Sequence, residues 1–488
     1  MQRRATVIGA GISGLTLASL LAHRGYAVTV LEQSDRPGGR AAQAIWDGFT
    51  FDLGPTLLFM LDVYREAFAR WGADFDRLVP TVRLRPNYRL HWPDGAALTV
   101  SPVLSETIAS LETLAPGSSK NLLAYLASAA RAYELSRKEF VGERIRSFAH
   151  FLTPRKIAGL FAAGAFSRLG AAAKAAFGSE RVANAFSFQS MYLGMSPYDS
   201  PLLYRLLLFT ELGEGIHFPI GGIGSLARAL ERSAIDLGVA IHYGEAATAF
   251  ERDARRVTAV RTASGRYACD LVACSADLPY VYETLLGETR HRSLRMAQTP
   301  SALLIYLGLD RGYGDLLHHE FLMPSSLRDT CDDIFARGAV PRDPAIYLCA
   351  PATTDPSMAP PGGEALYVLV PSPNLRGSTD WRSQTPALAQ RILETIERRR
   401  LPGLRSRIRF MRTRTPLDFR HELNLNDGAA FGLSHDVLQI GPLRPDNRHK
   451  RLKNLFFTGA STRPATGLPL VTLSAMQTAD RIFEEIPA

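Results

Sequence analysis

The sequence predicts an α/β fold in which both ends of the chain and a middle block close one domain. Three observations lead to this prediction. A buried strand at Ala5–Ile8 runs directly into a glycine-rich turn and a helical segment. Strand and helix patterns alternate again after Gly221. Close to the C-terminus, the stretch Asn454–Ala460 has the pattern of a further buried strand that ends in glycine.

The N-terminal unit has the pattern of a dinucleotide-binding βαβ motif. The strand is followed by the turn Gly9-Ala10-Gly11-Ile12-Ser13-Gly14, a helix over residues 15–24 and a second strand over residues 27–31. In this motif the first glycine permits the tight turn, the second lets backbone N–H groups approach a pyrophosphate, and the third lets helix and strand pack closely. Glu32 lies 18 residues after Gly14 (32 − 14), where a carboxylate can accept the ribose hydroxyls. The helix N-terminus favours the phosphate charge.

A second glycine turn identifies the dinucleotide as FAD. Gly38-Gly39-Arg40 follows Glu32 closely, and a nicotinamide enzyme needs no such turn there. FAD extends past its pyrophosphate and has to be held over a longer path. The glycines allow close backbone approach, and Arg40 offers a guanidinium fork for phosphate oxygens. The simpler alternative is a surface turn with a solvated arginine.

Composition limits the function classes. The 488 residues carry 56 Lys and Arg against 47 Asp and Glu, so the net charge of +9 favours an anionic partner. No nucleic-acid module is present, and nucleic acid is not expected as a partner. The four cysteines, Cys269, Cys274, Cys331 and Cys349, form no CxxC or Cys/His motif, so no metal site is expected and a reducing cytosol fits. Arg3-Arg4 and the following apolar residues are interpreted as part of the fold, not as a signal peptide, and no spanning helix is expected.

Residues 105–209 have a mainly helical pattern with concentrated positive charge. Between Arg131 and Arg181 there are ten Lys or Arg and four Asp or Glu. A helix predicted over Arg155–Phe161 begins after Pro154, and the region combines an apolar face with Arg155, Lys156, Arg168 and Lys174. Such a segment either lies on a membrane surface or packs as an amphipathic helix on its own core.

The remaining patterns complete the domain plan. Strands are predicted at residues 302–309 and 366–370 in a second sheet, helices at Ala387–Arg399 and Thr472–Ile486. We predict a discontinuous FAD-binding domain over residues 1–85, 213–290 and 430–488. A mixed-sheet substrate domain is predicted over residues 86–104 and 291–429, and a helical, membrane-facing subdomain over residues 105–212.

Four segments, in this order, resemble the bacterial and fungal type of phytoene desaturase, the FAD-dependent carotenoid desaturases that include the dehydrosqualene (diapophytoene) desaturases. They are the first glycine turn with its strand, the stretch from Leu31 to Ala41, the segment Phe51-Asp52-Leu53-Gly54-Pro55-Thr56, and residues 454–469. Phe218–Gly222 and Ala273–Asp277 match at corresponding places. The resemblance is nearly end to end, and it implies an amine-oxidase-like flavin fold, a long apolar isoprenoid substrate and peripheral membrane attachment.

The resemblance also implies a set of cofactor-binding residues. Glu32 would bind the adenosine ribose, Arg40 the phosphates and Ala247 the adenine through its backbone. The whole set is Gly9, Gly11, Gly14, Glu32, Gly38, Gly39, Arg40, Gly54, Pro55, Ala247, Gly459, Leu468 and Pro469. The chain departs from the family at Arg463 and Ala465, where a histidine and a glycine are usual. Arg463, the one catalytic candidate, cannot release a proton, and either stabilises charge on the flavin or has a structural role.

Desaturation transfers a hydride from one carbon of the substrate to the flavin and removes a proton from the neighbouring carbon. A polyene cation loses its proton readily, so a weak base suffices. Glu211, Glu214 and His217 are candidates, each interpreted more simply as a surface or loop residue, and no base is assigned. Because burying one CH₂ is worth about 0.8 kcal/mol, a 30- or 40-carbon chain would cost roughly 20 kcal/mol or more to place in water. The membrane interpretation of residues 150–181 is therefore favoured, with the protein on the cytoplasmic, inner face of the cell membrane.

Several activities stay open at this level. The motifs do not separate a phytoene or diapophytoene desaturase from a carotenoid oxidase, a hydroxycarotenoid desaturase or a redox-neutral carotenoid isomerase. An amine oxidase and a non-catalytic prenyl binder of the GDP-dissociation-inhibitor type are alternatives, although a pure binder needs no complete flavin cradle. The electron acceptor, a quinone or oxygen, cannot be read from the chain.

Overall fold

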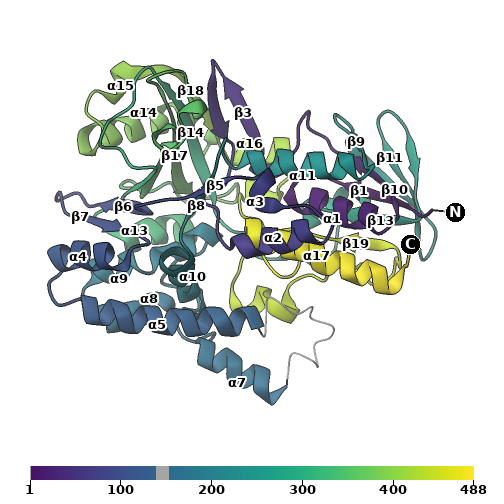
Figure 1. The fold of residues 1–488 in the computed structure, drawn as a ribbon, viewed down its shortest axis with the longest axis horizontal. Helices are drawn as coiled ribbons and strands as arrows, with labels where there is room; N and C mark the ends of the chain where they lie inside the picture. Colours follow the sequence, from purple (N-terminus) through teal and green to yellow (C-terminus); the bar gives the residue numbers. More distant parts are fainter. Residues whose placement is uncertain (1, 139–152) are drawn as a thin grey trace.

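A five-stranded parallel sheet draws its strands from both ends and the middle of the chain. The computed structural model describes residues 2–138 and 153–488. The strand order is β19-β13-β1-β2-β9, and every neighbouring pair is parallel. The strands are β1 (Arg4–Ile8), β2 (Ala27–Leu31), β9 (Ala240–His242), β13 (Leu271–Cys274) and β19 (Leu455–Phe457). Both termini lie at this end of the molecule (Figure 1).

Helices from distant parts of the sequence pack together on this sheet. The N-terminal helix α1 (Ile12–His23) contacts both α17 (Leu468–Glu485) and α11 (Gly224–Asp236). Their buried apolar residues form one core with the sheet, which also takes in α2 (Leu61–Ala69) and α3 (Phe75–Leu78). A separate small antiparallel sheet consists of β10 (Ala247–Arg252), β11 (Val257–Thr262) and β12 (Arg266–Ala268).

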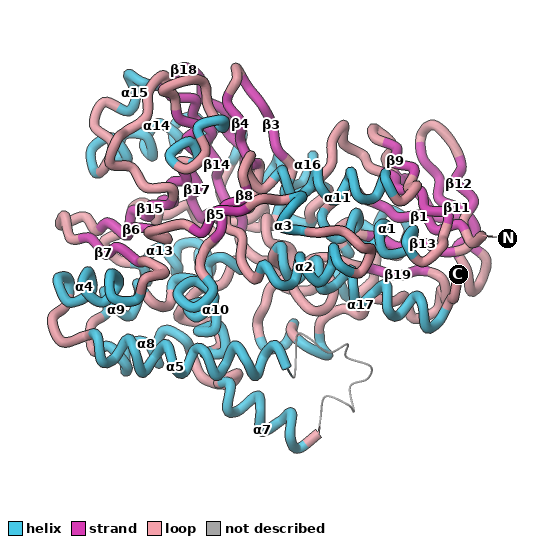
Figure 2. Tube along the Cα trace, viewed as in Figure 1, coloured by secondary structure: helices cyan, strands magenta, loops and turns pink. Residues whose placement is uncertain are grey.

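The second large sheet has seven strands in the order β18-β14-β17-β16-β15-β6-β7. Only the β15–β6 pair among these neighbours is parallel. The strands are β6 (Tyr88–His91), β7 (Ala97–Val100), β14 (Ser301–Leu309), β15 (His319–Leu322), β16 (Ile346–Cys349), β17 (Glu364–Ser372) and β18 (Ile408–Arg414). Figure 2 shows this sheet and its helices as a unit beside the parallel sheet.

Strand β14 is buried along its whole length and divides two cores. Leu303 and Ile305 belong to a core with α14 (Trp381–Arg399), whereas Ala302 and Leu304 belong to a core on the opposite face. This division follows from the alternation of side chains along a strand. Two antiparallel pairs complete the strands: the hairpin of β3 (Gln43–Trp46) with β4 (Phe49–Asp52), and β5 (Thr81–Arg83) with β8 (His217–Pro219), which are distant in sequence. Shorter helices lie between other strands: α12 (Leu278–Tyr280), α13 (Leu327–Cys331), α15 (Leu404–Arg407) and α16 (Pro416–Leu423).

A layer of helices covers the lower edge of the second sheet in Figure 1. It consists of α4 (Leu104–Leu114), α5 (Ser119–Ser136), α7 (Pro154–Ala163), α8 (Leu169–Phe177), α9 (Glu180–Ala185) and α10 (Leu206–Phe209). Within the described residues, no helix combines the length and apolar character that crossing a bilayer requires. Residues 139–152 of the predicted basic segment lie outside the described part of the chain.

The structure confirms the predicted α/β class and most elements, with shifted ends. The last helix begins at Leu468, four residues earlier than predicted, because Pro469 is tolerated in the first turn where no N–H partner is needed. The predicted strand Asn454–Ala460 is shortened to three residues. The prediction that Lys156 belongs to an exposed basic face is wrong, since its side chain is buried, whereas Arg155, Arg168 and Lys174 are exposed. The domain boundaries stay predictions.

Candidate active site

One cavity of about 760 Å³ joins the glycine turns to the helical layer. Gly9 and Gly11 line one end, and Leu160 and Phe166 of the helical layer line the other. Between them the wall is mostly apolar and includes Ala302 and Leu304, which lie on the face of β14 opposite to α14. A volume in this range is typical of small-molecule and cofactor sites.

Two glycines of the first turn are required by the local geometry, Gly9 by its backbone angle and Gly14 by a close backbone contact. Gly9 has φ = +97°, which an L side chain rarely adopts. A Cβ on Gly14 would lie 2.0 Å from the carbonyl oxygen of Gly9, so the predicted close packing of helix and strand at this glycine is confirmed. Gly14 itself lies behind the cavity wall, whereas Gly11, at the N-terminus of α1, lines the cavity.

Glu32 both braces the turn and lines the cavity. Its Oε2 accepts the N–H of Ala10 at 2.6 Å, and its Oε1 accepts the N–H and the hydroxyl of Ser34, each at 2.8 Å. A carboxylate has about four acceptor positions, so it can still accept hydroxyl groups from the cavity side. Its place at the end of β2 beside the glycine turn fits the predicted ribose contact.

Arg40 shows that this end of the cavity suits an anion. The residue follows Gly38 and Gly39, both with positive φ, and the N–H of Gly38 donates to the carbonyl of Ala10 at 2.9 Å. Among the described residues, the guanidinium of Arg40 has no hydrogen-bond or ion-pair partner, and it lines the cavity. Burial lowers its pKa, an effect that the carboxylate of Asp277 opposes. A partly buried cation without a partner among the described residues is unfavourable, so a bound pyrophosphate fits here.

The C-terminal wall is formed by the start of α17. Leu468 and Pro469 line the cavity at this helix N-terminus, whose partial positive charge favours an anionic group. Gly459 lies behind the wall, where its N–H donates to Ser474 Oγ at 3.0 Å. Arg463 does not line the cavity either: its guanidinium donates to the carbonyl of Pro442 at 2.8 Å and lies 3.4 Å from Asp446. Its role in the reaction stays a prediction.

The three other predicted residues lie on the cavity wall. Gly54 permits close contact, since a Cβ there would lie 2.1 Å from the carbonyl oxygen of Arg40. Pro55 follows it on the wall, and Ala247 lines the wall at the start of β10. The carbonyl of Ala247 accepts a hydrogen bond from Tyr280 at 3.2 Å.

Two further residues, Arg444 and Asp277, organise the C-terminal wall, and the sequence did not predict their roles. Arg444 is fully buried and donates to the carbonyls of Thr462 at 2.9 Å, Ser434 and Gln439 at 3.2 Å each, and Ala460. Burial lowers its pKa to about 10. Asp277 lines the cavity and accepts from the hydroxyl of Ser461 and the N–H of Asn426. Asp277 ends a segment that matches the resembled family, whereas nothing in the sequence around Arg444 marks it.

The three acid–base candidates have different surroundings. The interpretation of Glu211 as a surface or loop residue is wrong, because its side chain is completely buried and accepts hydrogen bonds from Tyr88, Tyr192 and Gln189. Burial raises its pKa to about 7. Glu214 and His217 are both partly exposed, and His217 lies on strand β8 and not in a loop.

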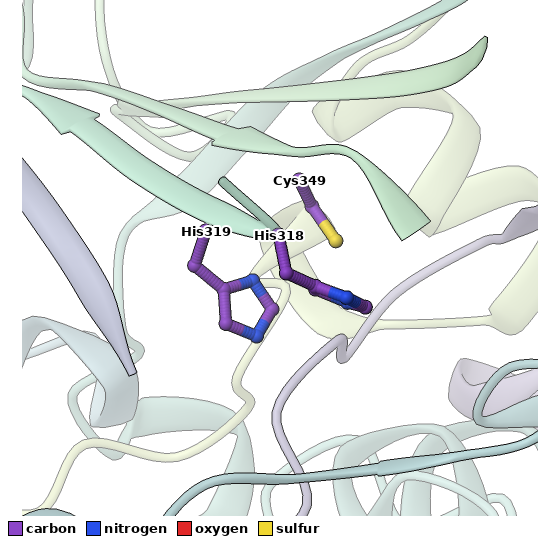
Figure 3. A group of neighbouring side chains, drawn as sticks. All are labelled: His318, His319 and Cys349. Atoms are coloured by element: carbon purple, nitrogen blue, oxygen red, sulfur yellow. The ribbon is translucent and has the colours of Figure 1, made fainter. Parts of the chain in front are cut away.

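His318, His319 and Cys349 are buried together beside the cavity (Figure 3). Their potential ligand atoms lie within 4.8 Å of one another, so of the described residues this group comes closest to a metal-binding set. However, His319 Nδ1 is already 2.8 Å from the hydroxyl of Tyr347, and His318 Nδ1 is 2.7 Å from that of Thr354. Burial lowers the pKa of His318 to about 3 and raises that of the thiol well above its usual range. These hydrogen bonds engage the two Nδ1 atoms, whereas both Nε2 atoms are buried without a hydrogen-bond partner among the described residues.

Comparison with known proteins agrees with this geometry. Residues 12–483 match the family described as flavin containing amine oxidoreductase. The chain is 42% identical over 486 residues to a zeta-carotene-forming phytoene desaturase of Myxococcus xanthus, covering 99% of this chain and 94% of the relative. It is 32% identical to a 4,4'-diapophytoene desaturase (4,4'-diaponeurosporene-forming) of Staphylococcus haemolyticus, covering 98% of each.

A solved structure supports the fold over the same length. An oxidoreductase from Methanosarcina mazei superposes with a TM-score of 0.67, at 16% identity, covering 98% of this chain and 100% of the other. At that identity the match concerns the fold alone.

Proposed function

This chain belongs to the family of flavin-containing amine oxidoreductases, and we propose that it introduces double bonds into an acyclic carotenoid precursor, phytoene or 4,4'-diapophytoene, with FAD as cofactor. The observation that carries the proposal is a continuous cavity that joins a glycine turn suited to an anion to a long apolar wall. Nearly end-to-end identity to carotenoid desaturases supports it.

The residues at the polar end would hold the cofactor. Gly9, Gly11 and the N-terminus of α1 would bind the pyrophosphate together with Arg40, and Glu32 would bind the adenosine ribose. Leu468 and Pro469 at the start of α17 would border the flavin, where the helix N-terminus favours negative charge. When bound, FAD supplies the hydride acceptor.

The residues at the apolar end would hold the substrate chain and exclude water. Tyr347 on β16 and Phe321 on β15 pack with ring centroids 4.8 Å apart on the cavity wall, and Ala302 and Leu304 lie on β14 of the same sheet. A wall of this kind orients an isoprenoid by contact area alone, since such a chain has no polar group for side chains to recognise.

The far end of the cavity supports uptake of the substrate from a membrane. Phe166 lines the cavity and is 60% exposed, and Phe161 on α7 is 66% exposed, with the two rings 4.8 Å apart. The exposed Arg155 and Arg168 accompany them. Exposed aromatic residues with basic neighbours are typical of surfaces that lie on anionic lipid. Peripheral attachment to the inner face of the cell membrane is therefore part of the proposal.

Expression in bacteria that make phytoene, and separately in bacteria that make 4,4'-diapophytoene, tests the activity. We expect coloured extracts from at least one strain, and the absorption spectrum gives the number of double bonds. Colourless extracts from both strains, with FAD-loaded protein present in the cells, would rule the proposal out. Anaerobic assays of the purified enzyme with a quinone or with readmitted oxygen separate the two electron acceptors.

A further inference from the structure

One buried carboxyl group beside the cavity has no role in the chemistry described so far. Glu211 lies in the short segment η5 (Thr210–Glu214) and is completely buried. Its Oε1 accepts the hydroxyl of Tyr192 at 2.9 Å, and its Oε2 accepts the hydroxyl of Tyr88 at 2.8 Å and the amide of Gln189 at 3.1 Å. All of these partners are uncharged, and none of the described residues places a cation beside the carboxylate.

Tyr192 connects this carboxyl group to the substrate end of the cavity. Its side chain lines the cavity, whereas Glu211 and Tyr88 lie behind it. The ring is held by Phe188, at a centroid distance of 5.7 Å, and by Phe59, at 6.4 Å. The phenolic oxygen donates its hydrogen to Glu211 and keeps lone pairs that can accept a proton from the cavity.

We propose that Tyr192 and Glu211 form the proton relay of the desaturation, with Tyr192 as the catalytic residue at the cavity wall and Glu211 as the positioning residue and final acceptor behind it. This assignment rests on the proposed function. With FAD bound as the hydride acceptor, the neighbouring carbon of the substrate would release its proton to the Tyr192 oxygen. The phenolic hydrogen moves to Glu211 Oε1, which becomes neutral. After product release the proton returns by the same route to water in the cavity.

A rival relay through Tyr347 is less suited to hold a proton. Tyr347 also lines the cavity, and its hydroxyl lies 2.8 Å from His319 Nδ1 and 2.6 Å from the hydroxyl of Thr56. Burial and the neighbouring His318 lower the pKa of His319 well below its ordinary value, so this imidazole holds a proton poorly near neutral pH. Burial raises the pKa of Glu211 to about 7, where a carboxylate can both accept and return a proton.

The titratable groups around Glu211 stay neutral over the same range. Tyr88 on β6 and Tyr192 on η3 (Phe188–Leu193) face its carboxylate, and Tyr347 on β16 faces Tyr192. Burial raises the pKa of all three phenols well above the ordinary value. A change in activity near pH 7 is therefore expected to follow Glu211.

Steady-state kinetics of Glu211→Gln and Tyr192→Phe, with purified FAD-loaded protein and the accepted precursor, test the relay. We expect kcat to fall about 100-fold in both variants, with KM and FAD content unchanged. In the wild type, kcat should rise with pH through about 7 as Glu211 ionises. This rising limb of the pH profile of kcat should disappear in Glu211→Gln and return in Glu211→Asp. Tyr347→Phe should keep the limb.

A matched control comes from the same segment. Glu214 accepts a hydrogen bond from Tyr133, which lines the cavity closer to the helical layer. Glu214→Gln should keep both kcat and its pH limb. If Glu211→Gln retains kcat within twofold, or keeps the limb, the relay is wrong. If the wild-type enzyme itself forms no coloured product from either precursor, the proposed function is contradicted instead.

A stability measurement gives a readout that does not depend on activity. Because the folded-state pKa of Glu211 is raised above its ordinary value, the folded protein binds this proton more tightly than the unfolded chain does. The free energy of unfolding should therefore fall between about pH 4.5 and about 7. The difference in unfolding free energy between wild type and Glu211→Gln should change over that range, and a constant difference would contradict the buried, titrating carboxyl group.

Discussion

The two ends of the cavity are built from different parts of the protein chain. At the cofactor end the wall is mainly backbone: glycines at positions 9, 11, 38 and 39, and the N-termini of α1 and α17. At the substrate end the wall is made of side chains, such as those of Tyr192, Phe321 and Leu304, that come from separate elements.

This difference explains what each end tolerates. Backbone contacts are fixed by turn geometry, so an added Cβ on Gly14 or Gly38 meets main-chain atoms that cannot move aside. Side chains at the substrate end can be exchanged for others of different size, which changes the space for a substrate while the backbone stays in place. Substitutions at the cofactor end should therefore change FAD binding, and substitutions at the substrate end should change which product is formed.

The largest effect is expected for Gly14→Ala. In most helices alanine is more favourable than glycine by about 1 kcal/mol, but this Cβ would lie 2.0 Å from the carbonyl oxygen of Gly9. We expect the free energy of unfolding to fall by about 1–3 kcal/mol and the protein to be purified without FAD. Absorption of the bound flavin and thermal unfolding measure both. Gly265→Ala, where nothing lies within 4 Å, is the control. A stable, yellow Gly14→Ala protein would contradict the backbone account of this end.

Arg40→Met tests the unpartnered cation in the cavity. Because a hydrogen bond to a charged group contributes about 1.5–3 kcal/mol, FAD should bind roughly 10- to 150-fold more weakly. The apoprotein should be at least as stable as the wild type, since a partly buried charge without a partner in the described part of the chain is removed. Flavin titration by fluorescence and thermal unfolding of the apoprotein give the two values.

The control for Arg40 lies in the same turn. Arg36 pairs with Asp35 at 2.6 Å and is substantially exposed, so Arg36→Met should leave FAD affinity unchanged. A destabilised Arg40→Met apoprotein with wild-type FAD affinity would assign Arg40 to the fold and not to the phosphates.

The same difference decided what the sequence could predict. The glycine turns, Glu32 and Arg40 are adjacent in sequence, and their spacing predicts their geometry because the interactions are local. Tyr192 and Glu211 meet only after η3 and η5 pack against β6, and no sequence period indicates that. Lys156 was misassigned for a related reason: a helical pattern predicts which residues share a face, but only packing decides which face is buried.

Adjacent residues of β14 separate effects on product from effects on stability. Ala302 faces the cavity, so Ala302→Phe should fill space there, lower the desaturation rate roughly tenfold and shift the product toward fewer double bonds, with FAD content unchanged. Leu303 faces α14, so Leu303→Ala should lower the free energy of unfolding by about 2–5 kcal/mol and leave the product spectrum unchanged. Pigment spectra and chemical denaturation test the pair, and an unchanged product from Ala302→Phe would remove β14 from the substrate wall.

The smallest effect is expected at the membrane end of the cavity, where Phe161 is 66% exposed and does not line the cavity. Full burial of such a side chain contributes about 1.5–3 kcal/mol, so partial insertion of one ring should contribute about 1 kcal/mol. Phe161→Ser should therefore bind anionic liposomes roughly fivefold more weakly, with activity in detergent unchanged, because detergent presents the substrate without a bilayer. Ile235→Ser is the matched control, since Ile235 is 54% exposed on α11, in the other half of the molecule. Equal weakening by both substitutions would mean that liposome binding responds to general hydrophobicity, and α7 would lose its place as the docking surface.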